Sequence, residues 1–188
     1  MGYFDDLTCF EPDDDLQPIS AEDLKSFEQK YSINLPKDYK DLLLRRNGGY
    51  VRFKNDDIPF CYFLTTNSSG RKSAPMIDSF WSIEFINEHS FGLLQEDQMP
   101  KHLLIIGESR DTTCYLCLGI SGETFGKVYT WMTSEFTDHW FNYDLDMPYT
   151  ERGEVRDRSE KIADSIRELL DGLCTEDEAR AWAPNEFG

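Results

Sequence analysis

The stretch that decides the fold is Leu35-Pro36-Lys37-Asp38-Tyr39-Lys40-Asp41-Leu42-Leu43-Leu44-Arg45-Arg46-Asn47-Gly48-Gly49. Tyr39, Leu42 and Leu43 follow the spacing of an amphipathic helix, which buries one apolar stripe. Pro36 suits the first helical position, because the N–H that it lacks would have no partner there. The glycine pair ends the helix, since glycine adopts left-handed conformations at little cost. Residues 50–53 then alternate with a period of two and predict a strand.

Another helix is expected just before this one, beginning at Ser20. Ser20 and Asp23 have the spacing of a capping box, in which the two residues bond each other's backbone N–H groups. Leu24, Phe27 and Tyr31 mark the side of this helix that is expected to be buried. Because the connection between the two helices is short, we expect them to form a helical hairpin.

The middle of the chain predicts an antiparallel sheet. The continuous apolar run from Leu103 to Ile106 is typical of a buried strand. Residues 113–120 and 127–131 predict two strands that a glycine-containing turn joins into a hairpin. Further strands are expected at residues 60–65 and 76–81, and a small helix at residues 82–88, with Ser82 as its cap.

A closing helix is expected near the end of the chain. Its apolar positions recur with the helical period, and Gly172 lies near its end; they are Ile162, Ile166, Leu169, Leu170 and Leu173. The order of elements indicates an α+β fold: an N-terminal helical hairpin, an antiparallel meander with a small inserted helix, and a closing helix packed on one face of the sheet.

One domain is expected, because 188 residues are enough to bury a core. We place it at residues 20–173, with an acidic and aromatic loop insertion at 136–157. An acidic N-terminal arm, residues 1–19, precedes it, and a C-terminal tail, residues 174–188, follows without an assigned element. The arm is expected to dock on the core through its apolar side chains, Tyr3, Phe4, Leu7 and Phe10.

The composition is strongly acidic, with 36 Asp and Glu, 19 Lys and Arg and a net charge of −17. Such a charge repels phosphate groups, so nucleic acid is not expected as a ligand, and it attracts a basic protein partner. No apolar run approaches the ~20 residues of a membrane span, and the first residues lack the pattern of a signal peptide. A cytoplasmic protein with five reduced thiols is therefore expected.

No motif indicates an enzyme, a metal site or a cofactor. Cys114 and Cys117 form a C-x-x-C pair, but within a strand three positions place two side chains on opposite faces. We therefore favour a structural role for both thiols. The histidines, His89, His102 and His139, have no metal-ligand spacing. A hydrolase that uses one of these cysteines with a histidine stays the less favoured alternative.

Three parts of the chain resemble the SUKH superfamily, which contains the fungal glucan-synthesis regulators. The first is Leu35-Pro36-x-Asp38-Tyr39-x-x-Leu42-Leu43, closed by Asn47-Gly48-Gly49. The second, similar to that family's central sheet, comprises Leu103–Gly107, Cys114–Leu118 and Gly126–Trp131. The third is similar to its closing helix and runs from Ile162 to Leu173, with Ile166 where an aromatic residue is common. Together they span roughly residues 20–173.

The resemblance implies a binding protein that performs no catalysis. Bacterial members resemble immunity proteins that neutralise secreted polymorphic toxins, often nucleases, and fungal members resemble signalling scaffolds. The acidic composition favours the immunity role, because a nuclease carries a basic cleft that an acidic protein can cover. A non-catalytic scaffold or adaptor is the alternative.

The surface that binds the toxin is expected to combine carboxylates, which set the approach rate, with aromatic side chains, which carry affinity. Its candidate residues lie in loops and in the insertion: Asp56, Asp57, Glu96, Asp97, Tyr143, Asp144 and Asp146. Neutralising such a set should slow association and flatten its salt dependence. A cation site at the paired acids is not favoured, because no calcium-loop pattern surrounds them.

Overall fold

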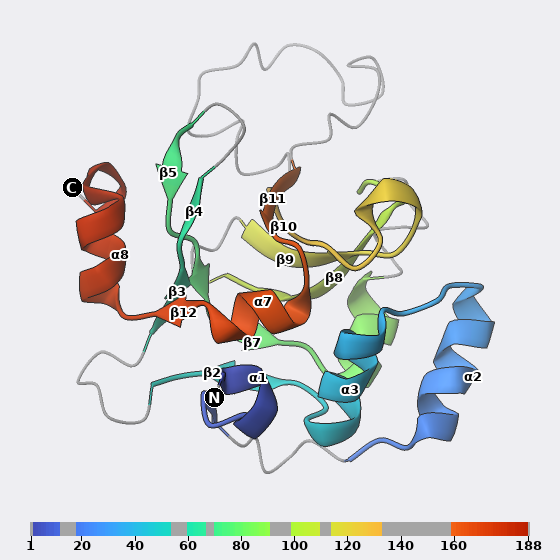
Figure 1. Cartoon of the computed structure of the whole chain (residues 1–188). Coiled ribbons are helices and arrows are strands. Elements are labelled where there is room, and N and C mark those ends of the chain that lie inside the picture. Colours follow the sequence, from blue (N-terminus) through green and yellow to red (C-terminus); the bar gives the residue numbers. More distant parts are fainter. Residues whose placement is uncertain are drawn as a thin grey trace, which may run out of the picture.

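The computed structural model describes residues 2–11, 18–53, 60–66, 70–90, 99–109, 114–132 and 159–187. Its centre is a seven-stranded antiparallel sheet in the order β1-β2-β7-β8-β9-β10-β11 (Figure 1). These strands are β1 (Phe10–Glu11), β2 (Gly49–Val51), β7 (Ser79–Phe80), β8 (Leu103–Glu108), β9 (Cys114–Gly119), β10 (Val128–Met132) and β11 (Ser159–Ala163). Because β7 to β11 are neighbours in chain order, the sheet contains the antiparallel meander that the sequence indicates.

Two smaller sheets complete the strand architecture. One has the order β12-β3-β6, and the other pairs β4 with β5. Their strands are β3 (Cys61–Phe63), β4 (Thr65–Thr66), β5 (Lys72–Ser73), β6 (Met76–Ile77) and β12 (Leu173–Cys174). The prediction of a single strand at 76–81 is wrong, because β6 and β7 belong to different sheets. Asp78 lies between them, donates its N–H to the Glu108 carbonyl at 3.1 Å and accepts the Val51 N–H at 2.8 Å.

The helices lie around the sheet, and Figure 1 shows α7 in front of it, α2 and α3 at one end and α8 at the other. They are α1 (Tyr3–Asp6), α2 (Ala21–Tyr31), α3 (Lys37–Arg45), α4 (Ile83–Phe85), α7 (Ile166–Asp171) and α8 (Glu176–Trp182). A π-helical turn, η1 (Ile86–Ser90), continues α4, and two 3-10 turns are η2 (Gly122–Thr124) and η4 (Pro184–Glu186). Ser20 and Asp23 form the expected capping box at the start of α2.

The closing helix is shorter than the sequence predicts, because residues 159–163 form strand β11 rather than its first turns. Ala163 lies opposite Val128 in the sheet. The four-residue spacing of Ile162 and Ile166 therefore comes from two buried residues in two different elements. The helix begins after Ser165, whose hydroxyl accepts the Glu168 N–H at 3.0 Å.

The chain after α7 folds into β12, α8 and η4. Thr175 caps α8 in a second capping box, with Glu178 as its partner. This part packs on β3 and β6 around a small second core, whose buried residues are Tyr62, Ala74, Cys174, Ala179 and Ala183. The main core lies at the sheet, where Leu103 to Ile106 of β8 are completely buried.

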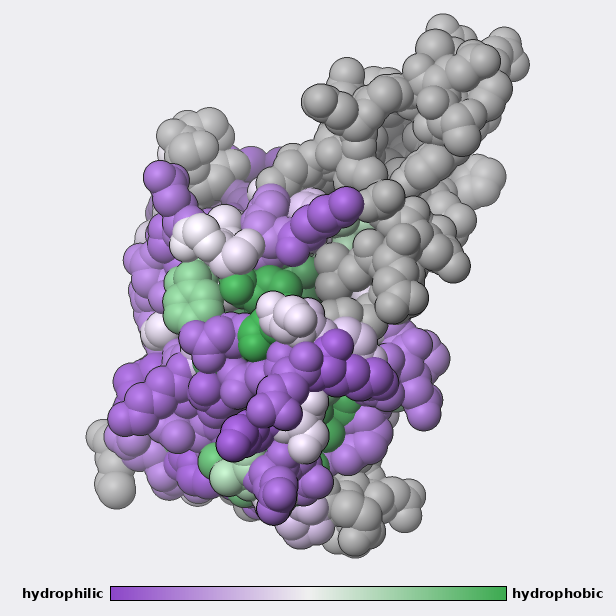
Figure 2. Space-filling view, turned by 90° about the vertical axis from the view of Figure 1, so that its right-hand side faces the viewer, coloured by the Kyte–Doolittle hydropathy of each residue, from purple (hydrophilic) through white to green (hydrophobic). Residues whose placement is uncertain are grey.

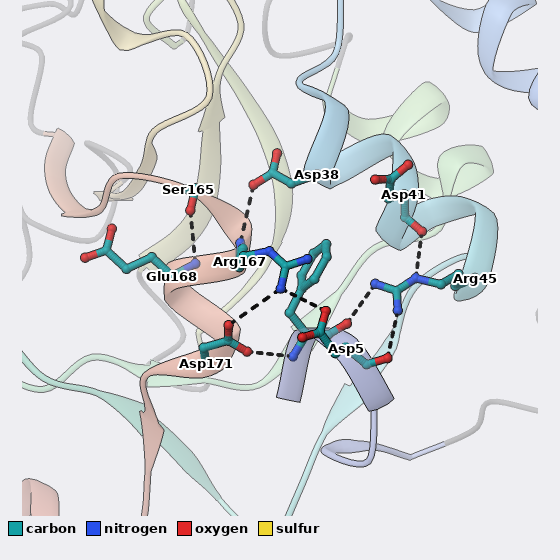
Figure 3. A network of polar contacts seen from close by, with 9 residues as sticks. Asp5, Asp38, Asp41, Arg45, Ser165, Arg167, Glu168 and Asp171 are labelled. Atoms are coloured by element: carbon teal, nitrogen blue, oxygen red, sulfur yellow. Dashed lines mark hydrogen bonds and ion pairs between the residues drawn. The ribbon is translucent and has the colours of Figure 1, made fainter. Parts of the chain in front are cut away.

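The N-terminal residues pack on the main core. Phe4, Leu7 and Phe10 are buried, as the sequence predicts. The Phe4 ring lies between two guanidinium groups, with Arg45 4.8 Å and Arg167 4.2 Å from its centroid. Arg45 also donates to the backbone carbonyls of Phe4 and Asp5, and Arg167 donates to the Asp5 carboxylate; Figure 3 shows these polar contacts joining α1 to α3 and α7.

The residues that carry the family resemblance hold distant helices in place. Asp38 of α3 accepts the backbone N–H groups of Ile166 at 2.9 Å and Arg167 at 3.3 Å, so it caps α7 (Figure 3). Asn47 accepts the Ile83 N–H at 2.9 Å and thereby caps α4. An orphan N–H at a helix start needs such an acceptor. Asp38 and Asn47 of the motif therefore have a structural role, which is to hold the starts of α7 and α4.

Asp38→Ala is expected to destabilise the protein by about 1–2 kcal/mol, because two N–H groups of α7 lose their acceptor. Urea denaturation measures the free energy of unfolding. The control is Asp41→Ala in the same helix, since the backbone carbonyl of Asp41, rather than its carboxylate, accepts a bond from Arg45. Equal losses for the two variants would contradict the capping role.

Candidate protein-interaction site

The residues expected at the partner surface all lie outside the described parts of the chain. They are Asp56, Asp57, Glu96, Asp97, Tyr143, Asp144 and Asp146. Their role in binding stays a prediction. The same holds for His139 as a catalytic partner.

The C-x-x-C pair lies in β9, as expected. Cys117 is buried inside the strand opposite Tyr129, whereas Cys114 is half-buried at the start of the strand opposite Met132. Within the described ranges, no three His, Cys, Asp or Glu side chains form a group that could hold a metal ion. The described helices include none with the length and apolar character needed to cross a membrane.

Native thiol labelling at pH 8 is expected to leave Cys9 and Cys117 unmodified while Cys114 reacts. Both unreactive thiols are completely buried, and burial raises the pKa of Cys9 to about 12, so it carries almost no thiolate at pH 8. Mass spectrometry of the labelled peptides measures the rates, and labelling in urea gives the reference for all five thiols. Rapid modification of native Cys117 would favour the catalytic-thiol alternative.

The surface of the molecule is mostly hydrophilic on the side that carries α2, and its apolar residues occupy only small areas there (Figure 2). On this side, exposed apolar contact is therefore supplied by small groups of side chains rather than by a broad apolar face. The large hydrophobic residues with the greatest exposure among those described are Leu44, Tyr50, Phe85 and Phe125. Phe85 differs from Phe125 because it belongs to a cluster of aromatic rings.

We call this cluster the α4 platform and define it as Trp81, Phe85, His89 and Tyr115 with the acids Glu84 and Glu88. The Phe85 centroid is 4.7 Å from that of Trp81 and 4.0 Å from that of His89. Trp81 also contacts Tyr115 at 5.8 Å. The buried Trp81 therefore supports the exposed Phe85 and His89 from below.

The helical segment of the platform is held at three points. At its start, the Asn47 side chain accepts the Ile83 N–H and donates to the Glu84 carboxylate, each at 2.9 Å. In its middle, Asn87 accepts bonds from Tyr31 and Lys30 of α2. At its end, the hydroxyl of the buried Ser90 accepts the Ile105 N–H at 3.0 Å. The platform is thus a fixed surface, and its π-helical turn is a feature that occurs frequently at functional sites.

The charge of the platform is negative. Glu84 and Glu88 are exposed beside Phe85 and His89. The nearby Lys30 donates to Asn87 at 2.7 Å and lies 4.9 Å from the Tyr31 ring centroid. Exposed aromatic rings flanked by carboxylates can bind an apolar and basic patch of another protein.

The sequence predicts the helix of the platform but does not single out its exposed aromatic face. Ser82 caps the helix, and Ile83 and Ile86 point inward, as expected. The missed signal is the repeat of an acid followed by an aromatic ring, Glu84-Phe85 and Glu88-His89, at a four-residue interval. This interval places both pairs on the outer face.

These observations define a mixed α+β domain with antiparallel sheets, a helix-capping N-terminal motif and an exposed aromatic platform. The SMI1 / KNR4 family (SUKH-1) profile matches residues 18–172, so the chain belongs to this family. In bacteria SUKH-1 proteins are known as toxin-immunity proteins, and the family is generally non-catalytic. No curated protein and no solved structure matches the chain.

Proposed function

We propose that this protein is a cytoplasmic immunity protein that binds a cognate secreted toxin and neutralises it by covering a basic surface, such as the cleft of a nuclease. The observation that carries the proposal is the net charge of −17 of the whole chain, whose residues 18–172 match the SUKH-1 family. A basic toxin and an acidic immunity protein attract each other before contact, which raises the association rate.

The α4 platform supports this proposal because it provides what an acidic surface alone lacks. Carboxylates that stay in solvent contribute little affinity, whereas aromatic side chains at the centre of an interface often contribute most of it. Phe85 and His89 offer such a centre next to Glu84 and Glu88. We propose the acids Asp56, Asp57, Glu96, Asp97, Asp144 and Asp146, together with Tyr143, as further contributors.

The test is capture of the partner with the tagged chain from the parent cell, followed by co-expression of the captured toxin domain. Cells that carry the toxin domain alone are expected to stop growing, and cells that also make this protein are expected to grow. The association rate of the purified pair should fall about tenfold or more between 50 mM and 500 mM salt, because salt screens the attraction.

Two results would overturn the proposal. One is an association rate that neither salt nor neutralisation of the acids changes, which removes the electrostatic part. The other is a captured partner that is harmless when expressed alone, which favours a scaffold or adaptor role. The control in the co-expression growth test is the destabilised variant Gly48→Ala, expressed to the same level as the unmodified protein. Because it folds poorly, it is expected to protect less.

A further inference from the structure

We propose that the α4 platform is the docking site for an arginine side chain of the partner protein, with the guanidinium stacked on Phe85 and held by Glu84 and Glu88. This inference rests on the proposed function for the identity of the partner but not for the chemistry of the site.

The same combination of groups occurs inside the protein, at Phe4. There the Arg167 guanidinium lies 4.2 Å from the ring centroid, and its Nη1 is 2.8 Å from the Asp5 carboxylate (Figure 3). The carboxylate fixes the guanidinium, and the ring supplies a flat, negative face for it. Phe4 with its carboxylates is therefore an internal example of what the platform presents.

Phe85 has the ring and the carboxylates but lacks the cation. Within the described residues, the Lys and Arg side chains that lie over aromatic rings are on Phe4, Tyr31, Tyr50, Phe60, Trp182 and Phe187, and none is on Phe85. Phe85 nevertheless exposes 40% of its surface beside Glu84 and Glu88. No Lys or Arg of the described residues supplies this cation, and the proposal assigns it to the partner protein.

Arginine fits this site better than lysine. A guanidinium is planar, so it can stack on the exposed part of the Phe85 ring while the N–H groups at its edge stay free to bond carboxylates. Glu84 already accepts a bond from Asn47 at 2.9 Å through Oε2, which orients it. Its other oxygen and the exposed Glu88 carboxylate are the acceptors that the proposal assigns to the guanidinium.

The test is a titration of the ¹⁵N-labelled protein with an acetylated and amidated tri-arginine peptide at 150 mM salt, followed by NMR. The largest chemical-shift changes are expected at the platform. Phe85→Leu keeps the apolar bulk but removes the π face, and it is expected to weaken binding about fivefold to tenfold. Glu84→Gln with Glu88→Gln should weaken it by a similar factor.

The matched control is the pair Phe125→Leu and Glu123→Gln at turn η2. Phe125 exposes 42% of its surface, nearly the same as Phe85, next to an exposed acid but outside the aromatic cluster. These control changes should leave peptide binding unchanged. A tri-citrulline peptide of the same shape without charge should not bind, and a tri-lysine peptide should bind more weakly.

The inference fails if the shifts spread over the acidic surface, if Phe85→Leu has no effect, or if tri-lysine equals tri-arginine. Because the titration uses no toxin, its failure leaves the immunity function open to the co-expression test. Conversely, arginine binding at the platform in a protein that protects against no toxin would keep the site and reject the immunity function.

Discussion

Gly48→Ala is expected to destabilise the protein by at least about 3 kcal/mol, a large part of the stability of an ordinary domain. Gly48 has φ of +97°, and a Cβ built on it would lie 2.7 Å from the Ser82 backbone nitrogen and 2.8 Å from the Phe80 carbonyl oxygen. The variant therefore suffers both left-handed strain and a clash with backbone at the start of α4. Urea denaturation followed by circular dichroism measures the loss.

The control for Gly48→Ala is Gly122→Ala, which separates the clash from the strain. Gly122 also has a positive φ, +58°, but nothing lies within 4 Å of an added Cβ. Only the conformational cost of about 1 kcal/mol applies there. Similar losses at the two positions would show that the close approach of Gly48 to α4 is not rigid.

Phe10→Ala is expected to cost about 3–5 kcal/mol, although the residue precedes the part of the chain that the family profile matches. Phe10 is 1% exposed, and its ring centroid is 5.6 Å from that of Phe80 in the middle of the sheet. Strand β1 pairs with β2 at the same place. The large loss follows because the change leaves a cavity beside the sheet.

Phe125→Ala is the matched control, because it removes the same side chain from an exposed turn, and it should change the stability by about 0.5 kcal/mol or less. Both variants are compared by urea denaturation. The slope of the unfolding free energy against urea concentration is compared as well, because a changed slope indicates a change in the surface that unfolding exposes. A loss below about 1 kcal/mol for Phe10→Ala would mean that residues 2–11 do not belong to the cooperative unit.

Local signals in the sequence identify several elements correctly. The box at Ser20 and Asp23 gives the start of α2, and the apolar run at Leu103 gives β8, because both depend on neighbours in the chain. The same kind of signal corrects the start of the closing helix and places α8, where no element was predicted. Ser165 with Glu168 and Thr175 with Glu178 mark the starts of α7 and α8.

Long-range packing accounts for what the sequence does not reveal. Asp38 caps a helix 128 positions later in the chain, and no periodicity predicts this pairing. The division of residues 76–81 between two sheets is equally non-local, since it depends on the partners of Asp78. The α4 platform is brought together in the same way, because Tyr115 joins it from β9.

The hydrogen bonds of Asn47, Asn87 and Ser90, which hold the α4 platform at three points, also affect the free energy of binding a partner there. A side chain or turn that is already ordered loses little freedom when a ligand arrives, so less of the contact energy is consumed by immobilisation. A partner that docks there therefore meets a surface close to its final shape, as in rigid-body association. Differences in affinity between related partners should then appear mainly as differences in residence time.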